Sequence, residues 1–221
     1  MNISINRFLA GSTAPFLLLF LALVTFPRTT EAERYLYYLE GVYANAYFFS
    51  SSGSIETAVN VNVIQQVTQN EKPKPSDEKT PLVVVTIRQW DTSTSQWVRN
   101  AYGESFDPVF EVKSNLRSAT VQATVRVSDW VLESSYDVTL NVSWTGIGAI
   151  TRQSSQENVH GSDFFSLFKY TGTNRSAEAV GSAVIVIDPN TKIDFISGPS
   201  DPTFTSLATV ERGEKTIFKL E

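Results

Sequence analysis

The sequence predicts an all-β fold, a single-domain antiparallel β-sandwich. The first reason is that apolar and polar residues alternate at a period of two along several short segments, which is the pattern of strands with one buried face. The second is that turn residues separate these segments at short intervals. The third is that, after the first 32 residues, no segment of 12 or more residues has the three-and-four spacing of an amphipathic helix. Many short strands of this kind are typical of immunoglobulin-like or jelly-roll-like sandwiches.

Residues 1–32 are expected to be a cleaved signal peptide. Arg7 precedes an apolar run at 14–26, and the small residues Thr30 and Ala32 precede the expected cleavage site after Ala32. The run is shorter than the roughly 20 residues that cross a bilayer, so no transmembrane segment is expected after cleavage, and an uncleaved anchor is the alternative. The domain 33–221 is therefore expected to be secreted, extracellular or held at the cell envelope. If the source is eukaryotic, the sequons at Asn141 and Asn174 become glycosylation candidates.

The strands are expected in the order in which turn residues divide the chain. The first, Tyr43–Phe49, is joined by a turn at Gly53 to the second, Ile55–Val67. The clearest alternation lies at 119–127 and 137–144, and the residues expected to face the interior there are Val121, Ala123, Val125, Val127, Val138, Leu140, Val142 and Trp144. The other expected strands are Leu82–Trp90, Trp97–Tyr102, Phe164–Tyr170, Ala183–Ile187, Lys192–Ile196 and Thr216–Leu220.

Four connections are expected to interrupt these strands. Residues 71–81 contain three prolines and six charges, which predicts a loop inside one domain. A linker between two domains is the less favoured alternative, because the block before it has too few strands to fold alone. Thr171–Asn174 and Asp188–Thr191 are expected to be turns. The polar segment Arg152–Asn158 is expected to be a solvated connection.

Composition excludes several classes of function. The chain has no cysteine, which excludes thiol catalysis, thiolate zinc sites and iron–sulfur clusters, and its one histidine excludes a multi-histidine metal centre. Without residues 1–32 the domain has 16 basic and 22 acidic residues, a net charge of −6. Nucleic acid is therefore not an expected partner, because its recognition needs a basic surface, and anionic membranes are disfavoured for the same reason.

The only histidine, His160, lies in the polar stretch 156–163. A nucleophilic triad with Asp163 or Glu157 is one interpretation. It lacks the strand, Gly-x-Ser-x-Gly and helix context that would hold such a nucleophile. A loop histidine is the favoured interpretation, and Glu157, His160 and Asp163 remain weak candidates for a ligand contact.

No cofactor is expected, and calcium is the alternative, for which the sequence offers no full set of ligands. Asp188, Asn190 and Asp194 have part of the spacing of a calcium loop, but Lys192 occupies the position of an oxygen ligand. A hairpin turn explains this spacing better.

Two pairs of acidic residues could serve glycoside hydrolysis if they faced one another at the right separation. One pair is Glu104 and Asp107, and the other is Asp129 and Glu133. Acidic residues are common at turns, so these pairs predict no enzyme by themselves.

The strongest candidate for a binding site is the segment from Trp90 to Trp97. If residues 92–95 form a four-residue loop, Trp90 faces Trp97 across the hairpin and Asp91 faces Gln96. Exposed aromatic faces bind the apolar faces of sugar rings, which favours carbohydrate. The alternative is a cross-strand pair that fixes the register and covers the core. The tyrosines at 35, 37, 38, 43 and 47 are either a second aromatic surface or half-buried strand residues.

Five segments follow one another along the chain: Phe49–Gly53, Ser118–Val125, Tyr136–Gly146, Ile150–Arg152 and Arg175–Gly181. In that order they resemble a group of uncharacterised exported bacterial proteins. The resemblance spans roughly residues 47–220 and implies export and a β-rich fold. Such relatives often carry more histidines and cysteines than this chain, which argues against a histidine-dependent role here.

Taken together, these features predict a non-catalytic binding or structural protein of the extracellular space or envelope. A polysaccharide or matrix component is the first expected ligand, and a protein bound through an edge strand is the second. An extracellular hydrolase that acts on a polymer is the alternative.

Overall fold

The computed structural model describes residues 34–69, 79–161, 164–188, 191–196 and 198–219. The expected signal peptide, residues 70–78 of the charged loop, Asp163 and the Pro189–Asn190 turn lie outside these ranges. The chain divides into two units, and the described residues all belong to the second unit, Glu33–Leu220.

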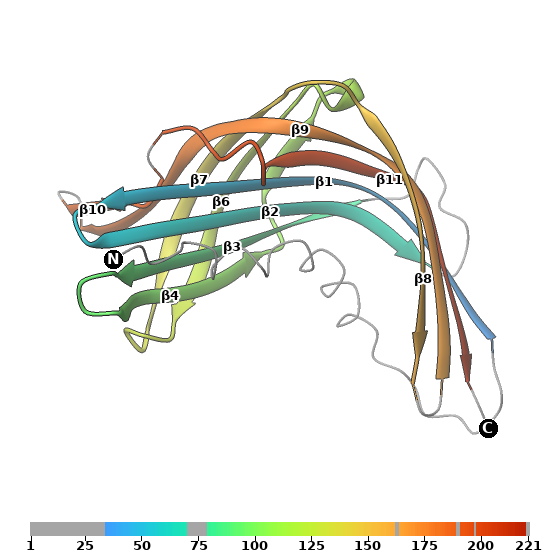
Figure 1. Cartoon of the computed structure of the whole chain (residues 1–221), viewed down its shortest axis with the longest axis horizontal. Coiled ribbons are helices and arrows are strands. Elements are labelled where there is room, and N and C mark those ends of the chain that lie inside the picture. Colours follow the sequence, from blue (N-terminus) through green and yellow to red (C-terminus); the bar gives the residue numbers. More distant parts are fainter. Residues whose placement is uncertain (1–33, 70–78, 162–163, 189–190, 197, 220–221) are drawn as a thin grey trace, which may run out of the picture. The chain divides into compact units, whose positions relative to one another are not determined.

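The second unit is built from antiparallel strands, which confirms the all-β fold (Figure 1). Apart from the 3-10 turn Ser114–Leu116, the described elements are all strands. They are β1 (Arg34–Ser52), β2 (Ile55–Gln69), β3 (Thr80–Asp91), β4 (Gln96–Ser105), β5 (Val109–Val112), β6 (Ser118–Asp129), β7 (Ser134–Gly146), β8 (Thr151–His160), β9 (Phe164–Asp188), β10 (Thr191–Asp194) and β11 (Ser206–Lys219). None of the described segments forms a helix with the length and hydrophobicity of a membrane span.

The strand pairings form a closed circuit. They run from β1 through β2, β3, β4, β6, β7, β9 and β11, and β11 then pairs with β1. β5, β8 and β10 each pair with one strand of this circuit. The two layers of the expected sandwich are thus continuous with one another and do not form two separate sheets.

The hydrophobic core lies between the β1–β2–β3 layer and the β6–β7–β9 layer. The inward positions follow the expected period of two, with Val59, Val61 and Val63 fully buried on β2. All of the residues expected to face inward on β6 and β7 are buried, except Ala123, which is half-buried and packs against the core. The Trp144 Nε1 hydrogen on β7 is donated to the Asn45 carbonyl oxygen on β1 at 2.9 Å, which joins the two layers.

The expected turn at Thr171–Asn174 is wrong, because β9 runs through it without a break. The two strands expected on either side are one strand of 25 residues. Glycine is a common turn residue, but Gly172 lies within β9 next to β11. A Cβ atom there would lie 1.9 Å from the Thr209 carbonyl oxygen on β11. The glycine therefore serves a close approach between strands, next to a register shift between Val210 and Arg212.

The expected solvated connection at Arg152–Asn158 is also a strand, β8, which pairs with β9 over its whole length. Its side chains are nevertheless mostly exposed on both faces, so the sequence has no apolar alternation to mark it. β5 was not expected either, because it has only four residues.

The connection between β10 and β11 packs along two strands at once. Ser200 N donates to the Ala179 carbonyl oxygen on β9 at 2.8 Å, and Asp201 N donates to the Tyr47 carbonyl oxygen on β1 at 2.9 Å. Thr205 is 1% exposed, and its Oγ1 accepts a hydrogen bond from Tyr47 N. This segment thereby fills the space between β9 and β1 where β11 has not yet begun.

Candidate functional site

The predicted Trp90–Trp97 hairpin is confirmed. Trp90 pairs with Trp97, Asp91 pairs with Gln96, and residues 92–95 form the loop. The two indole rings pack edge to face, with centroids 4.9 Å apart and planes at 72°. Trp97 is 38% exposed and Trp90 is half-buried, and neither belongs to the hydrophobic core. The pair therefore lies on the surface and remains accessible.

The loop between the tryptophans is held by Asp91. Its Oδ1 accepts hydrogen bonds from Ser93 N at 2.8 Å and Ser93 Oγ at 2.7 Å. The hydrogen bond from the Ser93 hydroxyl is the main reason that the pKa of Asp91 lies below its usual value. Thr92 N donates to the Ser54 carbonyl oxygen, which fastens this loop to the neighbouring turn between β1 and β2.

The tryptophan pair is one end of a larger aromatic surface, which we call the aromatic face. Trp90 pairs with Glu56 and Arg88 pairs with Ala58, which in turn pairs with Phe49. Because paired residues point to the same side of an antiparallel sheet, these side chains share the outer face of β1–β4. The aromatic face consists of Trp97, Trp90, Phe49, Tyr47 and Phe204.

The aromatic face crosses the strands at a steep angle. Phe49 is 52% exposed, and Tyr47 packs edge to face on Phe204, with centroids 5.8 Å apart. Three strand steps of about 4.8 Å separate Trp97 on β4 from Phe49 on β1, which gives a length of about 14 Å. Such a surface is longer than one sugar ring.

Charged groups lie among these rings. Arg88 is exposed and Glu56 is half-buried on the same face. Burial, and the nearby carboxylate of Asp201, raise the pKa of Tyr47. Glu56 pairs with Trp90, and Arg88 lies two residues before Trp90 on β3, so both charged side chains lie next to the tryptophan pair. Hydrogen-bonding groups are therefore available beside the aromatic rings.

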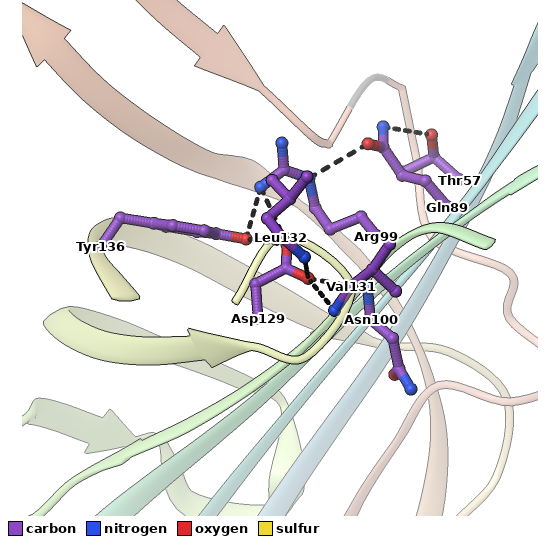
Figure 2. A network of polar contacts seen from close by, with 8 residues as sticks. All are labelled: Thr57, Gln89, Arg99, Asn100, Asp129, Val131, Leu132 and Tyr136. Carbon is purple, nitrogen blue, oxygen red and sulfur yellow. Dashed lines mark hydrogen bonds and ion pairs between the residues drawn. The ribbon is translucent and has the colours of Figure 1, made fainter. Parts of the chain in front are cut away.

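A second network lies on the inner side of the same hairpin (Figure 2). The Arg99 guanidinium on β4 donates to Asp129 Oδ2 on β6 at 3.2 Å and to the Tyr136 hydroxyl on β7 at 2.6 Å. Its Nε donates to Gln89 Oε1 at 3.2 Å, and the Gln89 amide donates to the Thr57 hydroxyl. The Asp129 side chain is fully buried. The network therefore joins β2, β3, β4, β6 and β7 at one end of the fold.

Asp129 also holds the turn between β6 and β7, Trp130–Glu133. Its Oδ1 accepts hydrogen bonds from Val131 N at 3.1 Å, Leu132 N at 3.3 Å and Asn100 N at 3.3 Å. Trp130 N donates to the Asn100 carbonyl oxygen, which places the turn beside the middle of β4. Asp129 is therefore the acceptor that joins this turn to β4 and β7.

The other pair of acidic candidates is Glu104, near the end of β4, and Asp107, which follows β4. Glu104 accepts a hydrogen bond from the Tyr102 hydroxyl at 3.2 Å, and Asp107 is exposed in the next connection. Among the described residues, no group of three or more acidic residues or histidine is arranged to hold a metal ion. Asp194 accepts a hydrogen bond from Ile196 N, as expected of a residue at the end of a hairpin.

His160 is the last residue of β8, so its assignment to a loop is wrong. Its ring packs on that of Phe165, with centroids 4.8 Å apart. Glu157 lies on the same strand with its side chain half-buried, while Asp163 lies outside the described residues. No serine is shown to hydrogen-bond to His160 within the described part of the chain.

Two features of this region were not predicted from the sequence. The contribution of Phe49 and Phe204 to the aromatic face depends on pairings between distant strands, which local patterns do not show. The capping role of Asp129 has a local signal, because both hairpins have an aspartate, four loop residues and then a polar residue. This repeat can be read in the sequence at 91–96 and 129–134.

No protein-family model matches this chain, and no match was found among curated proteins or solved structures.

Proposed function

We propose that this protein is an exported, non-catalytic binding protein that recognises an extracellular polysaccharide through the aromatic face. The observation that carries the proposal is that five aromatic side chains on β1, β3, β4 and the β10–β11 connection share one outer surface. The C–H faces of sugar rings pack on aromatic rings, and the hydroxyl groups then need polar partners. Arg88 and Glu56 provide such partners between the rings.

The proposal accounts for the composition of the surface. Aromatic residues contribute a large apolar area with little loss of side-chain entropy, and Trp and Tyr also carry a polar group. The net charge of −6 after residue 32 favours a neutral ligand over an anionic one. The expected signal peptide would deliver the protein to the compartment in which such polymers occur.

The test is retention on a panel of insoluble and arrayed polysaccharides, with and without calcium. We expect the purified protein to be retained on one class of neutral glycan, and the double variant Trp90→Ala, Trp97→Ala to lose retention. Its thermal stability should fall by only about 1 kcal/mol, the usual contribution of an exposed aromatic pair. Phe106→Ala is the matched control, because Phe106 is 62% exposed outside the aromatic face. Retention that survives the double substitution would refute the proposal.

Protein binding through an edge strand is a second candidate, supported by β8. This strand has ten residues and pairs with β9 alone among the described strands. An unpaired edge offers backbone groups that another strand can bind. Sedimentation over a range of concentrations tests this role, and a monomer at high concentration would argue against self-association through β8.

A further inference from the structure

The turn Trp130–Glu133 presents apolar side chains to solvent. Trp130 is 64% exposed, Leu132 is 49% exposed and Val131 is 40% exposed. We call these three residues the apolar tip. Large apolar side chains gathered on a surface mark an interaction site more often than isolated ones do.

The shape of this turn does not require apolar residues, as the neighbouring hairpin demonstrates. Both loops have four residues, and in both the last residue has a positive φ, 56° at Ser95 and 49° at Glu133. In both, the aspartate before the loop accepts a hydrogen bond from the backbone N–H two residues later. The first loop achieves this geometry with Thr92-Ser93-Thr94-Ser95. The apolar side chains at 130–132 are therefore not explained by folding.

The turn is also held in place before any ligand binds. Asp129 accepts hydrogen bonds from Val131 N and Leu132 N, which fixes the backbone of the turn. Its own charge is paired with Arg99 (Figure 2). Binding therefore does not have to order the loop, which removes an entropic cost.

We propose that the apolar tip inserts into the interface of a zwitterionic lipid membrane. The tip is a single hairpin end of three side chains, whereas a stable protein interface buries about 800 Å² on each partner. Its composition also matches a lipid interface, where the indole of tryptophan lies at the headgroup level and aliphatic side chains enter the acyl region. Val131 and Leu132 offer no hydrogen bonds to a sugar, unlike the charged residues of the aromatic face.

The charges around the apolar tip predict which lipid headgroups it should bind. Glu133 is the only charged residue in the turn, and it is exposed. Arg99, the nearest cation that the described hydrogen bonds connect to the turn, is engaged by Asp129 and Tyr136. An anionic surface would repel Glu133, so phosphatidylcholine should bind the tip better than a mixture with phosphatidylserine.

The experiment is co-sedimentation of the purified protein with phosphatidylcholine vesicles, with and without phosphatidylserine. The test variant carries Trp130→Thr, Val131→Ser and Leu132→Thr, which copies the neighbouring loop and should preserve the fold. We expect its vesicle-bound fraction to fall about tenfold or more, given the apolar area that is removed. Val180→Thr is the matched control, since Val180 is 55% exposed on β9 and should not affect binding.

Each outcome decides for or against membrane insertion. If the triple variant does not fold, the single variant Leu132→Ser provides the same test. Quenching of Trp130 fluorescence by brominated lipid is a further test, with Trp130→Phe as the blank. No vesicle binding by the unsubstituted protein, or equal binding by the variant, would overturn the inference. If the unsubstituted protein is a dimer and the triple variant is a monomer, the tip is assigned to protein contact. If the triple variant loses retention on glycan, the tip is assigned to the aromatic face. Trp97→Ala should leave vesicle binding unchanged, which separates this inference from the proposed function.

Discussion

Trp144 on β7 donates its indole N–H to the backbone carbonyl oxygen of Asn45 on β1 at 2.9 Å, across the interior of the fold. Trp144 is only 1% exposed, and a buried indole N–H needs an acceptor. The two residues are 99 positions apart in the sequence, so this contact joins two layers whose strands are distant along the chain.

The first prediction concerns that hydrogen bond. Trp144→Phe removes the donor and leaves the Asn45 carbonyl oxygen without this partner in the interior. An unsatisfied buried polar group costs about 1–3 kcal/mol, and the smaller ring adds a cavity. Chemical denaturation should show this loss, whereas the exposed Trp130→Phe should change stability by less than about 0.5 kcal/mol. Equal effects of the two substitutions would contradict the structural role of Trp144.

The second prediction concerns the buried ion pair. Asp129→Ala leaves the half-buried Arg99 without its charged partner and frees the turn beyond it, so stability should fall by about 3–5 kcal/mol. Glu111→Ala is the control, because its pair with Lys113 is exposed on both sides and should contribute less than about 1 kcal/mol. Denaturant titration of both variants gives the comparison, and a small loss for Asp129→Ala would show that the network is not structural.

The third prediction concerns the close approach of β9 and β11. Gly172→Ala would place a Cβ atom 1.9 Å from the Thr209 carbonyl oxygen, so the strands must separate. Such crowding costs about 1–3 kcal/mol or more. Gly148→Asn is the control, because Gly148 has open space around it and a φ of 65°, which asparagine tolerates. Thermal unfolding should distinguish the two variants, and no loss in Gly172→Ala would mean that the strands separate freely there.

The fourth prediction concerns pH. The hydrogen bonds from Ser93 lower the pKa of Asp91 from its ordinary value of 3.8, so they stabilise the charged form in the folded state. A lowered pKa contributes stability above the unfolded value, and that contribution is lost as the pH falls through the folded value. Asp91→Asn should therefore melt below the unsubstituted protein at neutral pH, and the difference should shrink in acid. A difference in melting temperature that stays constant with pH would argue against this linkage.

The sequence predicted best those features that depend on neighbours along the chain. The alternation at 119–127 and 137–144 identified half-buried strands, and the loop length between Trp90 and Trp97 gave the register of their hairpin. The sequence did not predict the features that depend on a strand far away along the chain. The polar strand β8 is held by its pairing with β9, and Gly172 looks like a turn residue until the backbone of β11 is placed against it. The aromatic face likewise exists only once β1 lies beside β2.

The closed circuit of strands also affects how fast the protein can fold. β1 pairs with β11 over Arg34–Asn45 and Phe218–Ser206, so this pairing joins the first and the last of the described strands. Contacts between such distant segments slow folding, because the chain loses loop entropy before they form. Until β11 is in place, β1 and β9 each have one edge without this partner. An unpaired strand edge can bind another chain, so slow pairing of β11 exposes the protein to aggregation.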